Sequence, residues 1–328
     1  MSNTVAAIDC GTNTIRLLIT TETADGAFKE LIREQRFVGL GQGVDATGTF
    51  TAAALTRTFA ACEEYAKIIA AHQVSRVRFV ATSATRDAAN RSEFLTGVST
   101  RIAVIPEVIS GTEEASLSFR GALFGLQQPT TPNFSKCDRK EDTPCESPQL
   151  ITPVLVIDAG GGSTELVSGS TDGSITEMLS MDIGSRRIRE RYLTSDPPTT
   201  TQIHAAQAQV RQLLSATAIN YKAVRTVVAV AGTATTMSAL IQRLDVYDRT
   251  RVHLSRLTRD EIATLTQRLL GSTVAQIAAL KPVQPQRAKV LAAGALLLNE
   301  IVQHIGIATL TVSETDILDG IALTLLST

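Results

Sequence analysis

The sequence predicts an α/β protein made of two related domains, and three pairs of matched segments support this fold class. Each pair has one member in the first half of the 328-residue chain and one in the second half. The members are a strand that runs into a glycine turn, a helix with apolar spacing, and a strand that enters a helix through small hydroxyl residues. Because the three features recur in the same order at nearly one spacing, we infer an internal duplication.

The first pair consists of two hairpins, at residues 5–19 and 154–167. In each, an apolar strand ends at an aspartate, a glycine turn follows, and a second strand begins. At a spacing of 149 residues Asp9 aligns with Asp158, and Arg16 aligns with Glu165. Both hairpins continue to an Asp-Gly turn signal, at 25–26 and at 172–173.

The remaining elements follow in order along both halves. Apolar spacing predicts helices near 51–73 and 199–222, and strands entering helices are expected at 77–85 and 227–235. After the second copy we expect a helix over 287–304, a strand over 307–312 and a helix over 317–326. Residues 127–153 carry five prolines and a charged run, which predicts a flexible surface insertion.

Composition narrows the class of protein. Apolar residues make up 44% and charged residues 19%, and there is no run of 18 apolar residues, so no membrane span is expected. The N-terminus enters a strand without a basic leader, which favours a cytoplasmic protein. The four cysteines form no CxxC pair, so neither a zinc site nor a disulfide framework is expected. The net charge of −1 lacks the basic footprint of a nucleic-acid binder.

The turn of the second hairpin has the composition of a phosphate and metal site. Three adjacent glycines let a phosphate approach the backbone amides, which can form an anion-binding concavity. Asp158 and Glu165, on either side of the turn, are our candidates for holding Mg²⁺, which prefers oxygen ligands. The phosphate-binding candidates in this turn are Gly160, Gly161, Gly162, Ser163 and Thr164. The alternative is a tight hairpin in which Asp158 only caps the turn.

Three further loops would bind phosphate by the same logic. The first hairpin offers Gly11, Thr12, Asn13 and Thr14, and the later strand–helix junctions offer Ser83 in the first copy and Gly232 and Thr233 in the second. Any one of these loops alone is explained by an ordinary turn, but the paired arrangement favours binding.

Three arginines are candidates for neutralising phosphate charge: Arg16, Arg86 and Arg187. The guanidinium group presents a planar fork that matches phosphate oxygens. Arg187 belongs to a basic cluster at 186–191, where Arg187 and Arg191 would share one helical face. That cluster offers a path for a long polyanion, although a solvated surface helix would have the same composition.

Six stretches of this sequence carry a family resemblance. AAIDCGTNTIRLLI, VATSATRDAAN, VISGTEEASLSFRGAL, VIDAGGGSTELV, VAGTATTMSAL and SETDILDGIAL together resemble the exopolyphosphatase and guanosine pentaphosphate phosphohydrolase (Ppx/GppA) family of the actin-like superfamily. The resemblance implies two duplicated actin-like (ribonuclease H-like) α/β domains with the active site in the interdomain cleft. We place the first domain at 1–126, the insertion at 127–152 and the second domain at 153–314, with a helix at 315–328 returning to the first domain.

The resemblance also implies the reaction. It carries the role of catalytic base to Glu114, in Gly111-Thr112-Glu113-Glu114-Ala115, although Glu113 stays an alternative and two acids in a first turn also stabilise a helix. The expected activity is Mg²⁺-dependent exopolyphosphatase. Alternatives are a guanosine pentaphosphate phosphohydrolase, a kinase, and a non-catalytic polyphosphate or alarmone sensor. Polyphosphate is favoured because the chain has no Trp and no evident aromatic pair near a loop that would hold a base. The assembly state is left open, with a homodimer among the candidates.

Overall fold

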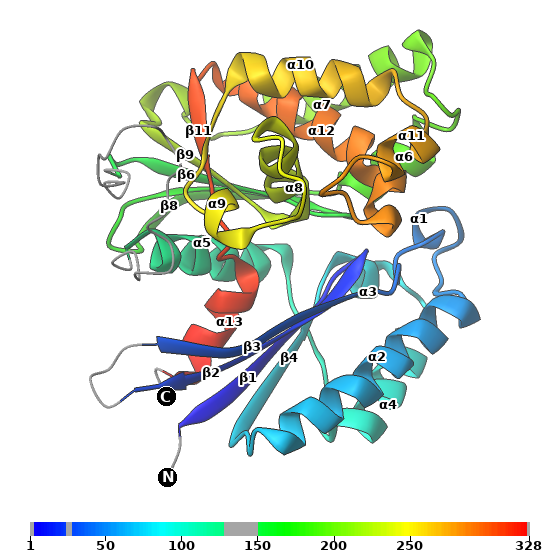
Figure 1. Cartoon of the computed structure of the whole chain (residues 1–328), viewed down its shortest axis with the longest axis vertical. Coiled ribbons are helices and arrows are strands. Elements are labelled where there is room, and N and C mark those ends of the chain that lie inside the picture. Colours follow the sequence, from blue (N-terminus) through cyan, green and yellow to red (C-terminus); the bar gives the residue numbers. More distant parts are fainter. Residues whose placement is uncertain (1–2, 24–27, 128–149, 327–328) are drawn as a thin grey trace. The chain divides into compact units, whose positions relative to one another are not determined.

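The computed structural model describes residues 3–23, 28–127 and 150–326, and the chain divides into two compact units (Figure 1). Unit 1 comprises Met1–Gly121 and Ile317–Thr328, and unit 2 comprises Ala122–Asp316. Most of the expected insertion, residues 128–149, and the Asp-Gly turn at 25–26 lie outside the described residues.

Unit 1 is built on a five-stranded sheet in the order β3-β2-β1-β4-β5. The first three strands are antiparallel, and β4 and β5 continue the sheet in parallel with β1. The strands are β1 (Thr4–Cys10), β2 (Thr14–Glu22), β3 (Phe28–Phe37), β4 (Arg76–Ala81) and β5 (Glu107–Val108). The helices are α1 (Val44–Thr47), α2 (Ala52–Ala71), α3 (Ser83–Asp87), α4 (Arg91–Ile102), α5 (Gly111–Gln127), which continues into unit 2, and α13 (Ile317–Leu326).

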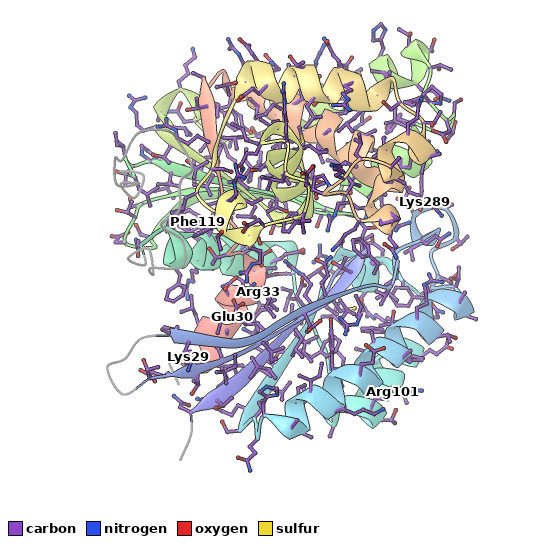
Figure 2. All side chains as sticks on the ribbon, in the orientation of Figure 1. Lys29, Glu30, Arg33, Arg101, Phe119 and Lys289 are labelled. Carbon is purple, nitrogen blue, oxygen red and sulfur yellow. The ribbon has the colours of Figure 1, made fainter. Side chains whose placement is uncertain are left out.

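Both faces of β1 are buried. Successive side chains of a strand point to opposite faces of the sheet, and β1 carries apolar residues on both. Ala6, Ile8 and Cys10 belong to one cluster, which includes apolar residues of α2 and α4. Ala7 belongs to a second cluster with residues of α5 and α13. On the first face, Gly97 of α4 leaves room for the ring of Phe59 of α2. The guanidinium of Arg101 covers that ring at 4.5 Å from its centroid, and Figure 2 shows Arg101 beside the helices of unit 1.

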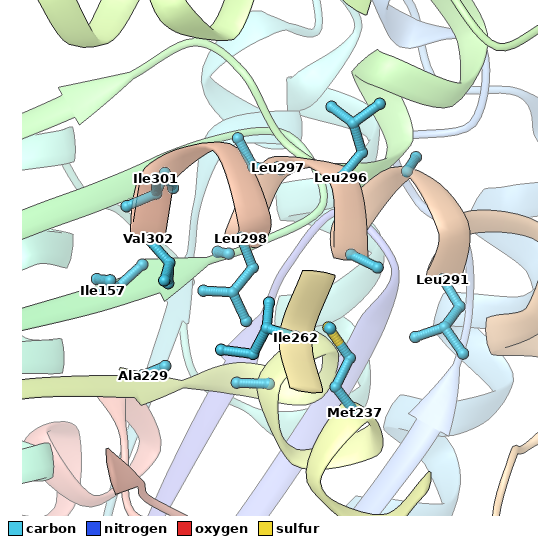
Figure 3. Close-up of a cluster of buried hydrophobic side chains, with 14 of the residues drawn as sticks. Ile157, Ala229, Met237, Ile262, Leu291, Leu296, Leu297, Leu298, Ile301 and Val302 are labelled. Carbon is cyan, nitrogen blue, oxygen red and sulfur yellow. The ribbon is translucent and has the colours of Figure 1, made fainter. Parts of the chain in front are cut away.

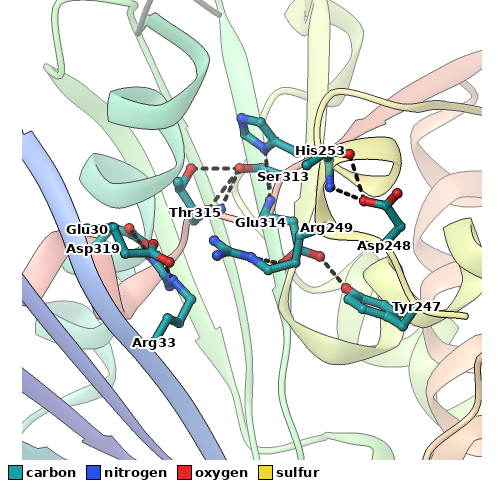
Figure 4. Close-up of polar contacts among 11 residues, drawn as sticks. Glu30, Arg33, Tyr247, Asp248, Arg249, His253, Ser313, Glu314, Thr315 and Asp319 are labelled. Carbon is teal, nitrogen blue, oxygen red and sulfur yellow. Dashed lines mark hydrogen bonds and ion pairs between the residues drawn. The ribbon is translucent and has the colours of Figure 1, made fainter. Parts of the chain in front are cut away.

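Helix α13 is fixed to the sheet of unit 1 by polar contacts as well as by apolar packing. Arg33 of β3 forms an ion pair with the buried carboxylate of Asp319, and it also binds Glu30 on its own strand (Figure 4). Gly320 lets α13 pack closely against α5, because a Cβ at this position would lie 2.0 Å from the carbonyl oxygen of Leu117 in α5. The helix is therefore an integral part of unit 1.

Unit 2 repeats the arrangement in a six-stranded sheet, β10-β11-β9-β6-β7-β8. Three antiparallel strands are again followed by parallel ones, and β10 adds an antiparallel edge. The strands are β6 (Val154–Ala159), β7 (Thr164–Gly169), β8 (Ile175–Met181), β9 (Thr226–Val230), β10 (Arg256–Thr258) and β11 (Thr309–Val312). The helices are α6 (Ser185–Arg191), α7 (Thr200–Ser215), the 3₁₀ turn η2 (Tyr221–Ala223), α8 (Ala231–Ile241), α9 (Arg249–Val252), α10 (Arg259–Leu270), α11 (Val274–Ala278) and α12 (Pro285–Ile305).

Helix α12 supplies much of the core of unit 2. Leu297, Leu298 and Ile301 are fully buried in a cluster that includes Ile157 of β6 and Ala229 of β9 (Figure 3). Of the described helices, α12 has the length and hydropathy to cross a membrane, but 67% of its most apolar window is buried inside the protein. Its apolar residues are accounted for by this core.

The structure confirms the predicted duplication, and most predicted elements match within a few residues. The helix expected near 199–222 is shorter, since α7 ends at Ser215 and Tyr221–Ala223 forms the separate 3₁₀ turn η2. Strand order is the same in both sheets apart from β10. The helix boundaries follow ordinary capping chemistry, since Thr51 caps α2 and Thr199 and Gln202 form a capping box at α7. Helix α12 begins with Pro285 in its first turn and ends at Gly306 in the left-handed conformation.

Candidate active site

The glycine loop of unit 2 joins β6 to β7 in a tight turn. The amide of Gly160 donates to the carbonyl oxygen of Ser163 at 3.1 Å, and a Cβ on Gly160 would lie 3.0 Å from that same oxygen. The short strands on either side therefore fix the loop at the carboxyl end of β6. Open α/β sheets commonly bind ligands at this edge.

The carbonyl groups of this loop are held by the start of α6. The amide of Ser185 donates to the carbonyl of Gly160 at 3.0 Å, and that of Arg186 donates to Gly161 at 2.9 Å. Gly184 makes this contact sterically possible, because a Cβ there would lie 2.5 Å from the backbone of Gly161. Among the described residues, the amides of Gly161 and Gly162 donate to no backbone carbonyl. The loop therefore has the carbonyls of Gly160 and Gly161 satisfied, while the amides of Gly161 and Gly162 are available for an anion.

Unit 1 has the same construction. The amide of Gly11 donates to Thr14 at 2.9 Å, and the carbonyl of Thr12 accepts from the amide of Gly41 at 2.9 Å. Gly41 lies against this loop as Gly184 lies against the other, since a Cβ there would be 2.4 Å from the Thr12 side chain. Asn13 is held through its carbonyl, which accepts from two amides of the segment after β3. The hydroxyls of Thr12 and Ser83 are 3.0 Å apart, so these two predicted phosphate ligands lie together.

Two carboxylates lie opposite each other beside the glycine loop of unit 2. Asp158 and Glu165 are direct partners in the β6–β7 register, and they are 8% and 1% exposed. The hydroxyl of Ser180 on β8 donates to Glu165 at 2.8 Å. Like charges directly opposite on two strands destabilise a sheet, and a nearby cation relieves that repulsion.

This donor set fits a hard divalent cation. It consists only of oxygen atoms, which Mg²⁺ prefers, and Mg²⁺ usually takes one or two carboxylates with water and substrate phosphates as its other ligands. Within the described part of the chain, no group of three or more His, Cys, Asp or Glu side chains could hold a metal ion. The two carboxylates therefore suit a metal that also binds its substrate.

The corresponding position in unit 1 holds an ion pair. Asp9 and Arg16 are direct partners in the β1–β2 register, and Arg16 donates to the same oxygen of Asp9 from Nη2 at 2.6 Å and from Nε at 3.0 Å. A phosphate contact by Arg16 stays a prediction. The structure adds that part of its guanidinium is already directed at a carboxylate.

The two adjacent acids of α5 have different surroundings. Glu114, whose side chain is 11% exposed, accepts from Nη1 of Arg86 at 2.8 Å. The same Nη1 donates to the carbonyl of Ile109. Glu113 is 45% exposed and binds Arg78, which also binds Glu107 at the surface. The geometry therefore distinguishes the two acids and favours Glu114 as the site residue, with Arg86 as its partner.

The third loop, at the start of α8, lies next to the glycine loop. Val230 is the register partner of Asp158, so the loop follows at the same edge of the sheet. A Cβ on Gly232 would lie 1.9 Å from Nη1 of Arg287, which shows that this guanidinium covers the loop. Thr233 is buried against Gly294 of α12. Arg287 is thus a positive group at this edge that sequence reasoning missed.

One aromatic side chain, Tyr247, lies by this loop, and it is a single ring rather than an aromatic pair that would hold a base. Tyr247 donates a short hydrogen bond to Glu314, and Arg249 binds the other carboxylate oxygen at 3.1 Å (Figure 4). Burial, followed by the charge of Glu314, raises the pKa of Tyr247, while a hydrogen bond with Thr235 and the charge of Arg287 oppose that shift. Its hydroxyl is therefore a neutral donor engaged within the protein.

The basic cluster at 186–191 forms α6, as predicted, but several of its charges have partners in the protein. Arg186 lies 3.4 Å from Glu190, Arg187 lies 4.0 Å from Asp182, and Arg189 donates to the carbonyl of Ser195. Arg191 is exposed. The role of Arg187 in phosphate binding stays a prediction.

Sequence reasoning also missed Gly41, Gly184 and Ser180. A glycine soon after the third strand of each repeat was the available signal for the first two. For Ser180 the signal was the two-residue alternation of β8, which cannot be placed in register with Glu165 before the hairpin is known.

Comparison with known proteins decides the family. The sequence pattern of the Ppx/GppA phosphatase family matches residues 19–132 and 149–328. The chain belongs to this family. It is 43% identical over 335 residues to "Exopolyphosphatase 2" of Mycobacterium tuberculosis, with 98% of both chains covered.

Solved structures agree with this assignment to the Ppx/GppA family. The crystal structure of an exopolyphosphatase-like protein superposes with a TM-score of 0.88 at 39% identity, covering 98% of this chain and 97% of that one. A Ppx/GppA enzyme of Aquifex aeolicus superposes with a TM-score of 0.78 at 28% identity, with both chains fully covered. The predicted actin-like fold class is therefore confirmed, and the chain is a phosphatase-family hydrolase.

Proposed function

We propose that this chain is a Mg²⁺-dependent exopolyphosphatase, which releases the terminal phosphate of inorganic polyphosphate by hydrolysis in the cytoplasm. The observation that carries the proposal is the register pair Asp158 and Glu165, two buried carboxylates next to a glycine loop whose amides are available. The name of the M. tuberculosis relative, at 43% identity, supports the same activity.

In this proposal Asp158 and Glu165 hold the metal ion, and the amides of Gly161 and Gly162 bind phosphate oxygens. When bound, the ion would neutralise charge on the phosphate oxygens. Ser180 orients Glu165 by its hydrogen bond, as outer groups often orient metal ligands. The glycine loop keeps its shape without the ligand because α6 and Ser163 hold it.

Glu114 is the proposed general base. It would take a proton from a water whose oxygen attacks the terminal phosphorus, while the bond from that phosphorus to the bridging oxygen breaks. The products are orthophosphate and a chain shorter by one phosphate. Arg86 holds the Glu114 carboxylate in one orientation through its hydrogen bond of 2.8 Å.

Phosphate release, measured with polyphosphate and with guanosine pentaphosphate in the presence and absence of Mg²⁺, tests the proposal. We expect Mg²⁺-dependent release from polyphosphate with the higher kcat/KM. A higher kcat/KM for guanosine pentaphosphate would assign the nucleotide activity instead. Binding without release would indicate a sensor, and transfer of phosphate to an acceptor would indicate a kinase.

The variant Asp158→Asn tests the metal ligands. It removes a ligand charge while keeping the size of the side chain, so we expect a severe loss of turnover and a higher Mg²⁺ requirement. Asp172→Asn is the matched control, because this fully exposed aspartate lies in the hairpin turn after β7 and asparagine suits the same turn. Wild-type Mg²⁺ dependence in Asp158→Asn would contradict the assignment.

A further inference from the structure

In both units, the segment that follows the third strand of the sheet holds the glycine loop by backbone hydrogen bonds. The amide of Gly41 donates to the carbonyl of Thr12 in unit 1, at 2.9 Å. The amide of Arg186 donates to the carbonyl of Gly161 in unit 2, also at 2.9 Å. Thr12 and Gly161 are aligned by the spacing of 149 residues between the two hairpins. The two loops are therefore held by equivalent bonds, and each depends on the segment that supplies the amide.

Each of these segments is itself fixed through a carbonyl three residues before the donating amide. In unit 2 the carbonyl of Ile183 accepts from the hydroxyl of Thr164 at 2.6 Å. In unit 1 the carbonyl of Val38 accepts from Nε of Arg57 at 2.8 Å. The two carbonyls hold equivalent positions, but their donors differ. The donor lies on strand β7 in unit 2, whereas in unit 1 it lies on helix α2.

The strand registers give the reason for this difference. At the spacing of 149 residues Thr164 aligns with Ile15, and the two lie at the same place in their hairpins. The side chain of Ile15 has no hydrogen-bond donor, so it cannot fix the carbonyl of Val38 as the threonine fixes its counterpart in unit 2. Ile15 belongs to the buried cluster that includes residues of α2, so this helix covers the same face of the sheet and can supply a donor instead.

We propose that Arg57 is a positioning residue for the glycine loop of unit 1, with the role that Thr164 has in unit 2. Through Val38 it fixes the segment 38–41, and the amides of this segment hold carbonyls of the loop. The amides of the loop are then in place for an anion before it binds, which lowers the cost of binding. This inference rests on the proposed function and on phosphate binding by the loop of unit 1. It adds a residue outside the loop on which the affinity for polyphosphate depends.

The variant Arg57→Met removes the donor and keeps much of the length of the side chain. Because Arg57 is exposed, the change leaves no buried charge without a partner. We expect KM for polyphosphate to rise roughly tenfold, on the scale of one hydrogen bond from a charged donor. The value of kcat at saturating substrate should stay near that of the wild type, since bound substrate then holds the loop. Arg57→Lys keeps a charged donor and should recover part of the affinity. Arg91→Met is the matched control, because it removes an exposed arginine at the start of α4 in the same unit.

The double variant Arg57→Met, Ile15→Thr separates the hydrogen bond from the charge. A threonine at position 15 would carry its hydroxyl where Thr164 has one in the other hairpin, so it could donate to the carbonyl of Val38 without restoring a positive charge. We expect the double variant to recover part of the wild-type KM, and Ile15→Thr alone to gain nothing. A folded double variant that keeps the KM of Arg57→Met would show that Arg57 acts through its charge, and this would overturn the positioning role.

Amide hydrogen exchange of the full chain without substrate tests the positioning without any assay of activity. We expect the amides of Gly39 and Gly41 to exchange faster in Arg57→Met than in the wild type, with no change at Arg186 in unit 2. Unchanged exchange at both glycines would overturn the inference, whatever the KM. Faster exchange with a wild-type KM would keep Arg57 as the residue that positions the loop, and phosphate binding by that loop would be the part that fails. The two failures are thus distinguishable.

Discussion

Glu114 accepts a hydrogen bond from Arg86 at 2.8 Å, while its neighbour Glu113 binds Arg78 at the surface. The two acids are adjacent in the sequence, but the turn of α5 directs them to different surroundings. Glu114 is the more buried of the two acids. Its partner Arg86 lies in α3, which begins at Ser83 just after β4. This difference yields a direct test of the catalytic base.

Replacing Glu114 by glutamine should lower kcat by roughly 10²–10⁴, the usual contribution of a general base. The amide has nearly the same shape but cannot accept the proton from water. Polyphosphate binding should persist, which equilibrium binding can measure. Glu113→Gln is the matched control and should keep near-wild-type turnover, so an inactive Glu113→Gln with an active Glu114→Gln would reverse the assignment.

Arg86→Gln should lower kcat by about ten- to a hundredfold, because a hydrogen bond to a charged group contributes roughly 1.5–3 kcal/mol. Without the positive charge, ionised Glu114 loses stabilisation, so the acid limb of the pH profile of kcat/KM should move to higher pH. Arg86→Lys should restore part of that shift. In the Glu114→Gln background, Arg86→Gln should have little further effect on kcat. A full additional loss there would show that Arg86 acts independently of Glu114.

Gly184→Ala should damage the glycine loop without touching any proposed ligand. The new methyl group would lie 2.5 Å from the backbone of Gly161, so the loop or the start of α6 must move. Overpacking of this kind costs typically about 1–3 kcal/mol of stability, and we also expect KM for polyphosphate to rise. Gly271→Ala is a suitable control, because its nearest neighbours would be 3.6 Å from the new Cβ. If Gly184→Ala and Gly271→Ala changed KM equally, the shape of the glycine loop would not determine polyphosphate binding.

Neutralising Arg187 and Arg191 together by glutamine should weaken binding of long polyphosphate more than that of short chains. The difference should be largest at low salt, where exposed charges are least screened. Since Arg187 already lies near Asp182 and Arg191 is exposed, Arg191→Gln alone should produce most of the salt-dependent part. The same loss of affinity at every chain length would remove α6 from the substrate path.

Cys10 and Cys62 should not react with iodoacetamide in the folded protein at neutral pH. Burial raises the pKa of the Cys62 thiol to about 12 and that of Cys10 well above its usual value, so the reactive thiolate is scarce in both. Both residues also lie in the core of unit 1. Peptide mapping by mass spectrometry should show labelling of these two cysteines only after denaturation, and rapid labelling of native Cys62 would indicate local opening of α2.

The duplicated sequence predicted the sheets well because each hairpin and each strand–helix junction is a local pattern. Alignment of the two copies matched Arg16 with Glu165 before the strand registers were known. The structure shows that the two residues hold equivalent positions, each paired with the aspartate of its own hairpin. Contacts between distant segments were not predictable in this way. Two such contacts are the hydrogen bond between Arg86 and Glu114 and the packing of Arg287 against Gly232. Both depend on how the helices pack on the sheet, and the local sequence pattern does not give that packing. The sequence could not distinguish Glu113 from Glu114 as the candidate base, because that distinction depends on which face of α5 is buried.

The position of α13 in unit 1 has a consequence for biosynthesis. Its residues Ile317, Leu318 and Ile321 cover one face of the first sheet, yet the ribosome makes them only after all of residues 122–316. Domains generally fold as units during synthesis, starting from the N-terminal side. The first sheet therefore keeps the face that α13 covers uncovered until synthesis reaches residues 317–326, long after residues 1–121 are made. We expect that apolar face to be a surface of the nascent chain that chaperones bind.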